Sequence, residues 1–140
     1  MAKVRDPDAG FFKMFGRALA RRCPRCGSSG VFASWFTLVE DCPGCGFHFE
    51  REDGYWIGAM IVNTTITFVL FIVVFVGGLL LTWPDPNWGL ILGVTIGVNL
   101  LLPIILYPLS KTVWSAAELS WHPLEESEIV EAMDRVESRS

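Results

Sequence analysis

Four cysteines form two pairs of the same pattern in the N-terminal part of the chain. Cys23 and Cys26 lie in CPRCG, Cys42 and Cys45 lie in CPGCG, and fifteen residues separate the two pairs. Two C-x2-C pairs at this spacing are typical of a four-cysteine zinc site, because each tight turn directs two thiolates at one ion. The sequence therefore predicts a tetrahedral zinc centre. A rubredoxin-like iron site uses the same four ligands and stays open as an alternative.

Glycine and proline residues support this interpretation of the cysteine pairs. Gly27 and Gly46 follow the pairs, and glycine lets the backbone turn past the metal and direct amide N–H groups at sulfur. Pro24 and Pro43 stiffen each turn. Because the cysteines fill all four coordination positions, the predicted ion is structural and has no open position for water. His48 is expected to be a packing residue between two phenylalanines rather than a ligand.

Other chemistry finds less support in these residue types. Structural disulfides are rare in the cytoplasm, where the direction of the chain derived below places the cysteines. Thiol redox work by a C-x-x-C pair stays open. We find no nucleophile–base pair, phosphate loop or paired carboxylates, so an enzyme is not expected and no small-molecule substrate is identified. Nucleic acid is disfavoured as the main partner, because 11 Lys and Arg face 15 Asp and Glu.

Two uncharged segments follow the cysteines. Residues 55–83 and residues 88–107 carry no charged side chain. A helix of about 20 apolar residues crosses the hydrocarbon core of a bilayer, so both segments are predicted to be transmembrane. The sequence Pro84-Asp85-Pro86-Asn87 between them ends the first helix and makes a turn. The elements that position the metal centre are therefore predicted to be an antiparallel transmembrane hairpin.

The basic residues give this hairpin a direction. The turn has no Lys or Arg, whereas Arg51 precedes the first helix and Lys111 follows the second. The positive-inside rule then places both termini in the cytoplasm and the turn outside. Residues 1–10 are polar and do not resemble a cleaved signal peptide.

Small and polar residues indicate how the helices pack in the bilayer. Gly89, Gly93 and Gly97 form a smooth stripe that allows close contact between helices. Asn63 and Asn99 lie at similar depths, so we expect them to meet each other, or each to meet its copy in a dimer. The amides are expected to be structural, because a transport site would need ionisable groups inside the spans. A homodimer or a membrane-protein partner is expected, in addition to the lipid bilayer.

The flanking segments are amphipathic. In Gly10–Arg22, Phe11, Phe12 and Phe15 lie on one helical face, while Arg17 and Arg21 lie on another. This pattern predicts a basic helix on the anionic inner leaflet, with packing on the cysteine segment or a partner as the alternative.

Further aromatic residues follow between the two cysteine pairs. Trp35 and Phe36 are candidates for contact with a partner or the membrane. The acidic tail, with Ile129, Met133 and Val136 in helical register, is expected either to dock on the cysteine segment or to bind a partner.

The predicted organisation has four parts. They are a basic amphipathic segment (1–22), a zinc ribbon with its linker (23–54), a two-helix transmembrane hairpin (55–107), and an interfacial segment with an acidic C-terminal tail (108–140). The fold class is therefore a membrane α-helical protein with an N-terminal cytoplasmic four-cysteine zinc ribbon, a transmembrane hairpin and a short amphipathic C-terminal helix.

Together, CPRCG, CPGCG, Asp53-Gly54-Tyr55 and a hairpin followed by Lys111 and Trp114 resemble the bacterial domain-of-unknown-function family numbered 983. The resemblance covers residues 17–120 and implies a small protein of the bacterial inner membrane with a cytoplasmic zinc ribbon. Family members often have Gly-Asp-Gly-Pro before the first span, and here only Asp53-Gly54 carries over. Genes of this family lie, in some bacteria, among those for cytochrome oxidase biogenesis, which implies an assembly role.

These features predict a non-enzymatic membrane adaptor or assembly factor, whose zinc ribbon docks a partner at the cytoplasmic face, in line with respiratory oxidase biogenesis. Two alternatives stay open: a metal-handling or thiol redox membrane protein, and a membrane-tethered zinc ribbon that binds nucleic acid.

Overall fold

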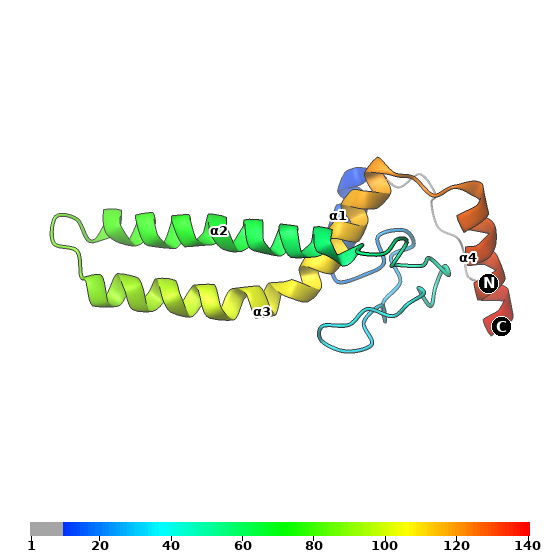
Figure 1. The fold of residues 1–140 in the computed structure, drawn as a ribbon, viewed down its shortest axis with the longest axis horizontal. Coiled ribbons are helices and arrows are strands. Elements are labelled where there is room, and N and C mark those ends of the chain that lie inside the picture. The colour runs from blue at the N-terminus through cyan, green and yellow to red at the C-terminus, as the bar shows by residue number, and fades with distance from the viewer. Residues whose placement is uncertain (1–9) are drawn as a thin grey trace.

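The computed structural model describes residues 10–140, which form a rod with a lobe at one end (Figure 1). The described residues contain α1 (Phe11–Leu19), α2 (Trp56–Leu81), α3 (Trp88–Trp121) and α4 (Glu126–Arg139). Residues 20–55, which we call the cysteine lobe, lie between α1 and α2 and hold all four cysteines. Residues 1–9 of the predicted basic segment 1–22 lie outside the described residues.

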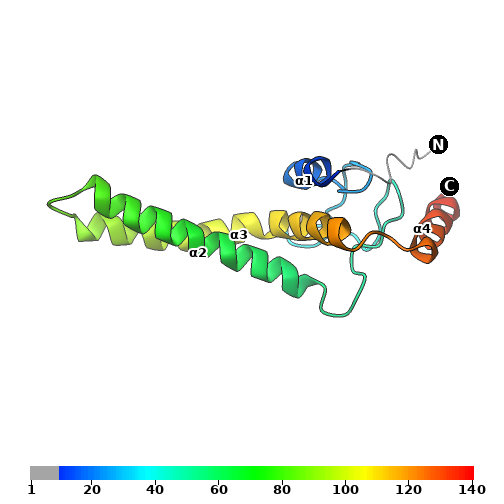
Figure 2. The ribbon, with the colours of Figure 1, turned by 90° about the horizontal axis from the view of Figure 1, so that it is seen from above.

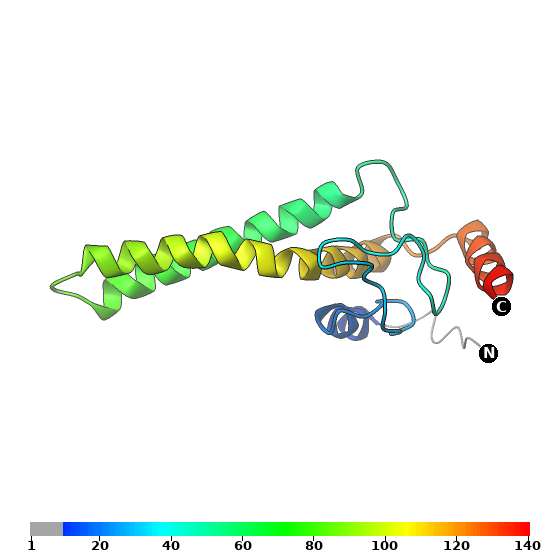
Figure 3. The ribbon, with the colours of Figure 1, turned by 90° about the horizontal axis from the view of Figure 1, so that it is seen from below.

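The rod consists of α2 and α3, which run antiparallel in contact with each other (Figure 1) and cross at a shallow angle, so that they separate toward the lobe (Figures 2 and 3). α2 ends at Leu81 and α3 begins at Trp88, so the predicted turn at residues 84–87 is confirmed. Asn87 caps α3, because its Oδ1 accepts the backbone N–H of Leu90 at 3.2 Å. Both helices are long and apolar enough to cross a membrane.

The rod leaves its apolar side chains uncovered. In the most apolar window of each helix, 0% of the α2 residues and 11% of the α3 residues are buried. A core helix of a soluble protein would instead be covered by the rest of the chain. At about 1.5 Å per residue, α2 is about 39 Å long, which exceeds the hydrocarbon core of about 30 Å. Its length and its uncovered surface both suit a lipid environment.

α3 is longer than the predicted second span, because it continues beyond Tyr107 to Trp121. Pro103 and Pro108 lie inside it. A proline removes a helical hydrogen bond and bends the axis, and Figure 1 shows α3 changing direction between its yellow and orange parts. The part of α3 beyond this bend leaves the rod and packs against the lobe through Leu119.

Asn63 and Asn99 do not bond to each other. The Nδ2 of Asn63 donates to the carbonyl of Pro103 at 3.4 Å, and its Oδ1 accepts from Ser110 at 3.4 Å. The Nδ2 of Asn99 donates to the carbonyl of Thr95, one turn back, at 2.8 Å. The prediction that the two amides meet within one chain is therefore wrong, because Asn63 reaches the bend of α3 while Asn99 is satisfied within its own helix. A contact with a second copy stays a prediction.

The glycine stripe also faces away from α2. It consists of Gly89, Gly93 and Gly97. A Cβ added at any of these positions would meet no atom of α2 within 4 Å. The buried residues of this part of α3 are Ile91 and Thr95, and Ile91 lies against Gly78 of α2. Since two residues turn a helix by about 200°, the glycines lie on the opposite side, and the prediction that they bring the two spans together is wrong. A dimer through the stripe stays a prediction.

The cysteine lobe is held without regular strands. The described residues contain two isolated antiparallel bridges, Phe32 with Leu38 and Asp41 with His48, and no strand. The expected zinc ribbon therefore has the two turns of a ribbon but not its β-sheet. Such a lobe cannot rely on a hydrogen-bonded sheet, so its order must come from the cysteines and from the helices that surround it.

α1 packs on α3 rather than standing free on the surface. Ala18 is fully buried, and its carbonyl accepts a 2.9 Å hydrogen bond from the hydroxyl of Thr112 in α3. The expected alternative, packing on the cysteine segment, is met in part, because Met14 lies against the lobe cluster while the main contact is with α3. Contact of this helix with the inner leaflet stays a prediction. Arg17 is corrected accordingly, because its guanidinium points to the lobe and donates to the carbonyls of Pro24 and Arg25 at 3.3 Å and 2.8 Å.

α4 docks on the cysteine lobe, which decides between the two expectations for the tail. Ala132 is buried at the contact, and its backbone lies directly against Gly46. Arg139 reaches back to the carboxylate of Asp41 at 3.2 Å. The buried face of α4 is therefore centred on Ala132, whereas Met133, predicted to lie on the apolar face, is 48% exposed.

Candidate metal centre

The two cysteine pairs adopt the same local turn. The backbone N–H of Gly27 donates to the carbonyl of Cys23 at 2.8 Å, and that of Gly46 donates to the carbonyl of Cys42 at 2.9 Å. Both glycines have positive φ angles, 76° and 69°. Only glycine adopts this conformation without a steric cost, so each C-x2-C-G segment folds as a metal-binding turn for a local reason.

The sulfurs of Cys23, Cys26, Cys42 and Cys45 converge on one point. All four Sγ atoms lie within 4.8 Å of one another. Two of the distances between the turns are 3.9 Å (Cys23 to Cys45) and 3.6 Å (Cys26 to Cys42). A tetrahedral ion with metal–sulfur bonds of about 2.3 Å would separate its sulfurs by about 3.8 Å. The cysteines are free thiols, and their spacing fits a zinc-sized ion.

Hydrogen bonds from a nearby hydroxyl and from neighbouring thiols favour the thiolate form of some of these cysteines. The hydroxyl of Ser28 lies 3.0 Å from the sulfur of Cys26 and 3.1 Å from that of Cys42. Hydrogen bonding, first of all with Cys23, lowers the pKa of Cys26. Hydrogen bonding, first of all with Cys26, together with burial raises the pKa of Cys23. A cation at the centre would stabilise all four thiolates, which is the usual condition of a structural zinc site.

The centre lies in the main buried cluster of the lobe. Three of the cysteines are buried and Cys26 is partly exposed. Apolar side chains surround them: Val31, Leu38, Phe47, Phe49 and Leu119. His48, which follows Phe47 in the sequence, is not among the grouped ligands, and its side chain is 40% exposed and pairs through Nδ1 with Asp41 at 2.8 Å. Among residues 10–140 the four sulfurs are the grouped ligand atoms, and an ion held by them would have the closed coordination of a structural site.

Separate elements brace the two turns from opposite sides. Arg17 of α1 holds the first turn through the carbonyls of Pro24 and Arg25. The second turn lies against α4, where Gly46 contacts Ala132 and a Cβ would meet the Ala132 carbonyl. Both terminal helices therefore contact the turns that would hold an ion.

A charge cluster joins the linker, the end of the lobe that directly precedes α2, to the C-terminal helices, and it was not predicted from the sequence. Arg51 donates to Glu128 at 2.7 Å and 2.8 Å, to Glu118 at 2.8 Å and to the carbonyl of His122 at 2.9 Å. The Arg51 guanidinium lowers the pKa of Glu128. The partners are 67 to 77 residues away in the chain, and the only sequence signal was a lone basic residue before the first span. This clamp fixes the linker to α3 and α4.

Several predicted contact residues remain exposed near the lobe. Phe12 is 88% exposed, Trp35 is 50% exposed and Phe36 is 44% exposed. Phe11 stacks against Phe15 with ring centroids 5.7 Å apart. These side chains are apolar surface on α1 and on the loop between the cysteine pairs (residues 27–41), which we call the aromatic loop.

Arg21 is part of this loop surface. Its guanidinium carbon lies 4.5 Å from the ring centroid of Phe32 and 4.7 Å from that of Trp35. Such cation–π contacts hold the aromatic loop in place.

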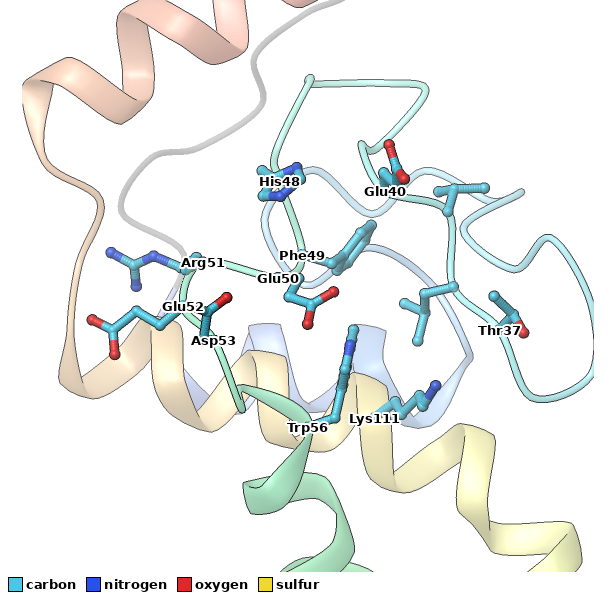
Figure 4. Close-up of a pocket in the computed structure, with 12 residues that line it drawn as sticks. Thr37, Glu40, His48, Phe49, Glu50, Arg51, Glu52, Asp53, Trp56 and Lys111 are labelled. Carbon is cyan, nitrogen blue, oxygen red and sulfur yellow. The ribbon is translucent and has the colours of Figure 1, made fainter.

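A pocket of about 800 Å³ lies between the lobe and the start of α2 (Figure 4). Trp56 stands up from α2 toward Glu50, and Lys111 of α3 lies beside it. The Nζ of Lys111 lies 4.7 Å from the Trp56 ring centroid and donates to the carbonyl of Phe36 at 2.7 Å. This lysine therefore ties the aromatic loop to the base of the hairpin. Glu40, Glu50, Glu52 and Asp53 make the lining rich in carboxylates.

The profile of one protein family matches the chain. The family is described as "Protein of unknown function (DUF983)", and the match covers residues 32–119, from the aromatic loop to the part of α3 that packs on the lobe. The match includes Cys42 and Cys45 and begins after the first cysteine pair. No curated protein and no solved structure matches the chain.

Proposed function

The chain belongs to the DUF983 family, whose function is unknown, and we propose that it is a membrane-anchored docking protein whose cysteine lobe is held by a structural zinc ion. In this proposal the hairpin spans a bacterial inner membrane with both termini in the cytoplasm. The lobe then stands at the cytoplasmic surface and binds a membrane-protein partner during assembly of a complex. The protein performs no catalysis of its own.

The observation that carries the proposal is the convergence of separate elements on the cysteine centre. Arg17 of α1 and Ala132 of α4 contact the two turns, and Leu119 of α3 packs beside the sulfurs. A structural ion at this point would make the lobe rigid and fix it to the hairpin. Rigid presentation of a surface is what a docking protein needs, because less conformational freedom is lost on binding.

The exposed aromatic surface supports a binding role at the membrane. Trp35 and Phe36 lie on the loop that Lys111 ties to the hairpin, and the ring of Phe36 lies 6.0 Å from that of Tyr107 at the end of the predicted span. Exposed aromatic residues of this kind are enriched where proteins bind one another. The carboxylate-rich pocket beside them offers space for a partner's basic side chains.

Membrane insertion is supported by the uncovered apolar rod and by the positions of the basic residues. The direction follows from Arg51 and Lys111 at the lobe end, and from the absence of Lys and Arg in the turn at residues 82–87. We propose zinc rather than iron because two C-x2-C pairs at this spacing are typical of a structural zinc site, with all four positions filled by cysteine.

Site-specific photo-cross-linking tests the docking role. A benzophenone amino acid at position 35 should capture a defined membrane protein in cells, because Trp35 is exposed on the loop. The same probe at position 137, on the outer face of α4, is the matched control and should not capture it. Replacement of Cys42 by serine should abolish the product from position 35 while the protein stays in the membrane.

Two results would refute the proposal. Equal cross-linking from positions 35 and 137 would indicate non-specific collision. Transfer of the bound metal from the intact protein to a weak chelator, with cross-linking unchanged, would favour metal handling over a structural ion.

A further inference from the structure

A second, smaller cavity lies on the α3 side of the linker, where the lobe joins the hairpin. Its volume is about 270 Å³. It is lined by three large aromatic residues, by three acidic residues, and by Gly54 and His122. The aromatic residues are Tyr55, Trp114 and Trp121, and the acidic residues are Glu52, Asp53 and Glu118. Figure 4 shows Glu52 and Asp53 on the linker, between Arg51 and the start of α2. This volume suits a small headgroup rather than a drug-sized molecule.

Two polar atoms of the lining are buried without a partner. Tyr55 is only 7% exposed, and its hydroxyl has no hydrogen-bond partner. Ser115 is a neighbour of this hydroxyl, but the Ser115 hydroxyl donates to the carbonyl of Lys111 at 3.0 Å and is not hydrogen bonded to Tyr55. The indole Nε1 of Trp114 is likewise buried without a partner. Buried polar groups are normally paired, so these two indicate a ligand with oxygen acceptors.

The aromatic side chains are held in place by the backbone around them. Gly58 of α2 lies directly against the indole of Trp114, and a Cβ there would collide with the ring. The Trp114 ring centroid is 6.3 Å from that of Tyr55 and 6.5 Å from that of Trp121, both in edge contacts. The site is therefore an aromatic wall of fixed shape.

The charges of the lining favour a cation. The lining contains Glu52, Asp53 and Glu118, together with His122, but no Lys or Arg. Glu118 is already paired, because one oxygen accepts from Arg51 and the other lies 3.6 Å from the His122 ring nitrogen. Glu52 and Asp53 have no such partner among the described residues and are the carboxylates available to a ligand. Aromatic rings together with carboxylates are the usual receptor of organic ammonium groups. A ligand with an ammonium group and a neighbouring phosphate would satisfy both the carboxylates and the two unpaired donors.

The cavity lies at the depth of lipid headgroups if the hairpin spans the membrane as proposed above. Tyr55 directly precedes α2, and aromatic residues at the ends of spans lie in the headgroup zone. We propose that this cavity binds the headgroup of a zwitterionic phospholipid, with its ammonium group between the Trp121 ring and the linker carboxylates and its phosphate facing Tyr55 and Trp114. This inference rests on the membrane placement in the proposed function.

The test measures which lipid the full chain retains. The protein is placed in vesicles of equal parts phosphatidylethanolamine and phosphatidylglycerol, floated on a density gradient, and then released for native mass spectrometry. We expect about tenfold preference for the ammonium lipid in the retained position. The double variant Asp53→Asn and Trp121→Leu should lose the preference. Because Trp121 is 68% exposed, this variant should keep its fold, which zinc content checks.

The matched control is the double variant Glu50→Gln and Trp35→Leu, which changes one acid and one tryptophan outside the cavity and should keep the preference. Equal retention of both lipids, or equal loss in both double variants, would overturn the inference. Displacement of the lipid by millimolar free phosphoethanolamine would overturn the lipid as its ligand and indicate a soluble ammonium phosphate. Protein that does not float would instead refute the membrane placement itself, and with it this inference.

Discussion

Replacement of Gly46 by alanine tests how the second cysteine turn and α4 depend on each other. Gly46 has a φ angle of 69°, and a Cβ at this position would collide with the backbone carbonyl of Ala132. Gly30 provides a matched control, because its φ angle is 81° and the nearest atom to its added Cβ is a Pro43 carbon at 4.0 Å. The two substitutions share the backbone cost and differ in the collision.

The expected losses of free energy follow from the cost of the backbone conformation and the cost of the collision. A non-glycine residue in the left-handed region costs about 1–2 kcal/mol, which applies to both variants. Forcing an extra carbon into a closed contact costs a further 1–3 kcal/mol, roughly, and applies to Gly46→Ala alone. Since the colliding atom is backbone, the strain is relieved by movement of α4 rather than by rotation of a side chain. The helix should therefore detach from the lobe in Gly46→Ala and remain docked in Gly30→Ala.

Limited trypsin digestion measures this detachment, because Arg135 lies in α4 and contacts the carbonyl of Gly46 at 3.4 Å. Cleavage that requires local opening becomes about tenfold faster for each 1.4 kcal/mol by which the opening is made easier. We expect cleavage after Arg135 to accelerate about tenfold in Gly46→Ala and less than about twofold in Gly30→Ala. Equal acceleration in both variants would refute the contact between Gly46 and α4 as the cause.

Three further predictions concern the contacts around the lobe. Arg51→Met should weaken docking of α4 on the linker by about 2–4 kcal/mol, because it leaves the carboxylates of Glu118 and Glu128 without their cation. Amide hydrogen exchange in α4 measures this loss, and Arg22→Met, at an exposed position, is the control. The pKa of the Glu128 carboxyl is lowered in the folded chain, so the stabilisation by its carboxylate is complete above the ordinary pKa of 4.5 and is lost as the pH falls below that value. The difference in amide exchange rate of α4 between the natural chain and Glu128→Gln should therefore stay constant from about pH 7 to about pH 5 and then shrink. Thr112→Val should speed exchange in α1 by an amount that corresponds to about 1–2 kcal/mol, whereas Thr65→Val, which removes a hydroxyl on the exposed rod, should leave α1 unchanged.

The cysteine centre was accessible from sequence because its determinants are local. Each turn requires two cysteines, a glycine with positive φ and little else, so CPRCG and CPGCG predict the geometry without knowledge of the fold. The apolar helices and their turn were accessible for the same reason, since each depends on a continuous stretch of uncharged residues.

The packing of the rod was not accessible in the same way. Asn63 was paired with the wrong residue because depth in a membrane does not fix rotation about a helix axis. The bend at the two prolines presents the carbonyl of Pro103, which no spacing rule for straight helices would select. Similarly, the position of Ile91 against Gly78 determines that the glycine stripe faces outward.

The contacts of the termini with the lobe depend on residues far apart in the chain. Ala132 is the buried centre of α4 because a small residue is needed where Gly46 approaches the helix backbone. The periodicity of the tail alone favoured Met133, which the structure leaves exposed. The Arg51 clamp likewise joins the linker to Glu118 and Glu128, and such pairs require the fold to be known.

The central claim is that one structural zinc ion holds the lobe to the hairpin, and the metal content of the purified protein tests it most directly. The protein is extracted in mild detergent, challenged with a modest chelator, and analysed by elemental mass spectrometry. We predict one zinc per chain before and after the challenge, and none in a variant with Cys23 and Cys42 replaced by serine. Iron in place of zinc, or zinc lost to the chelator while the fold persists, would contradict the claim.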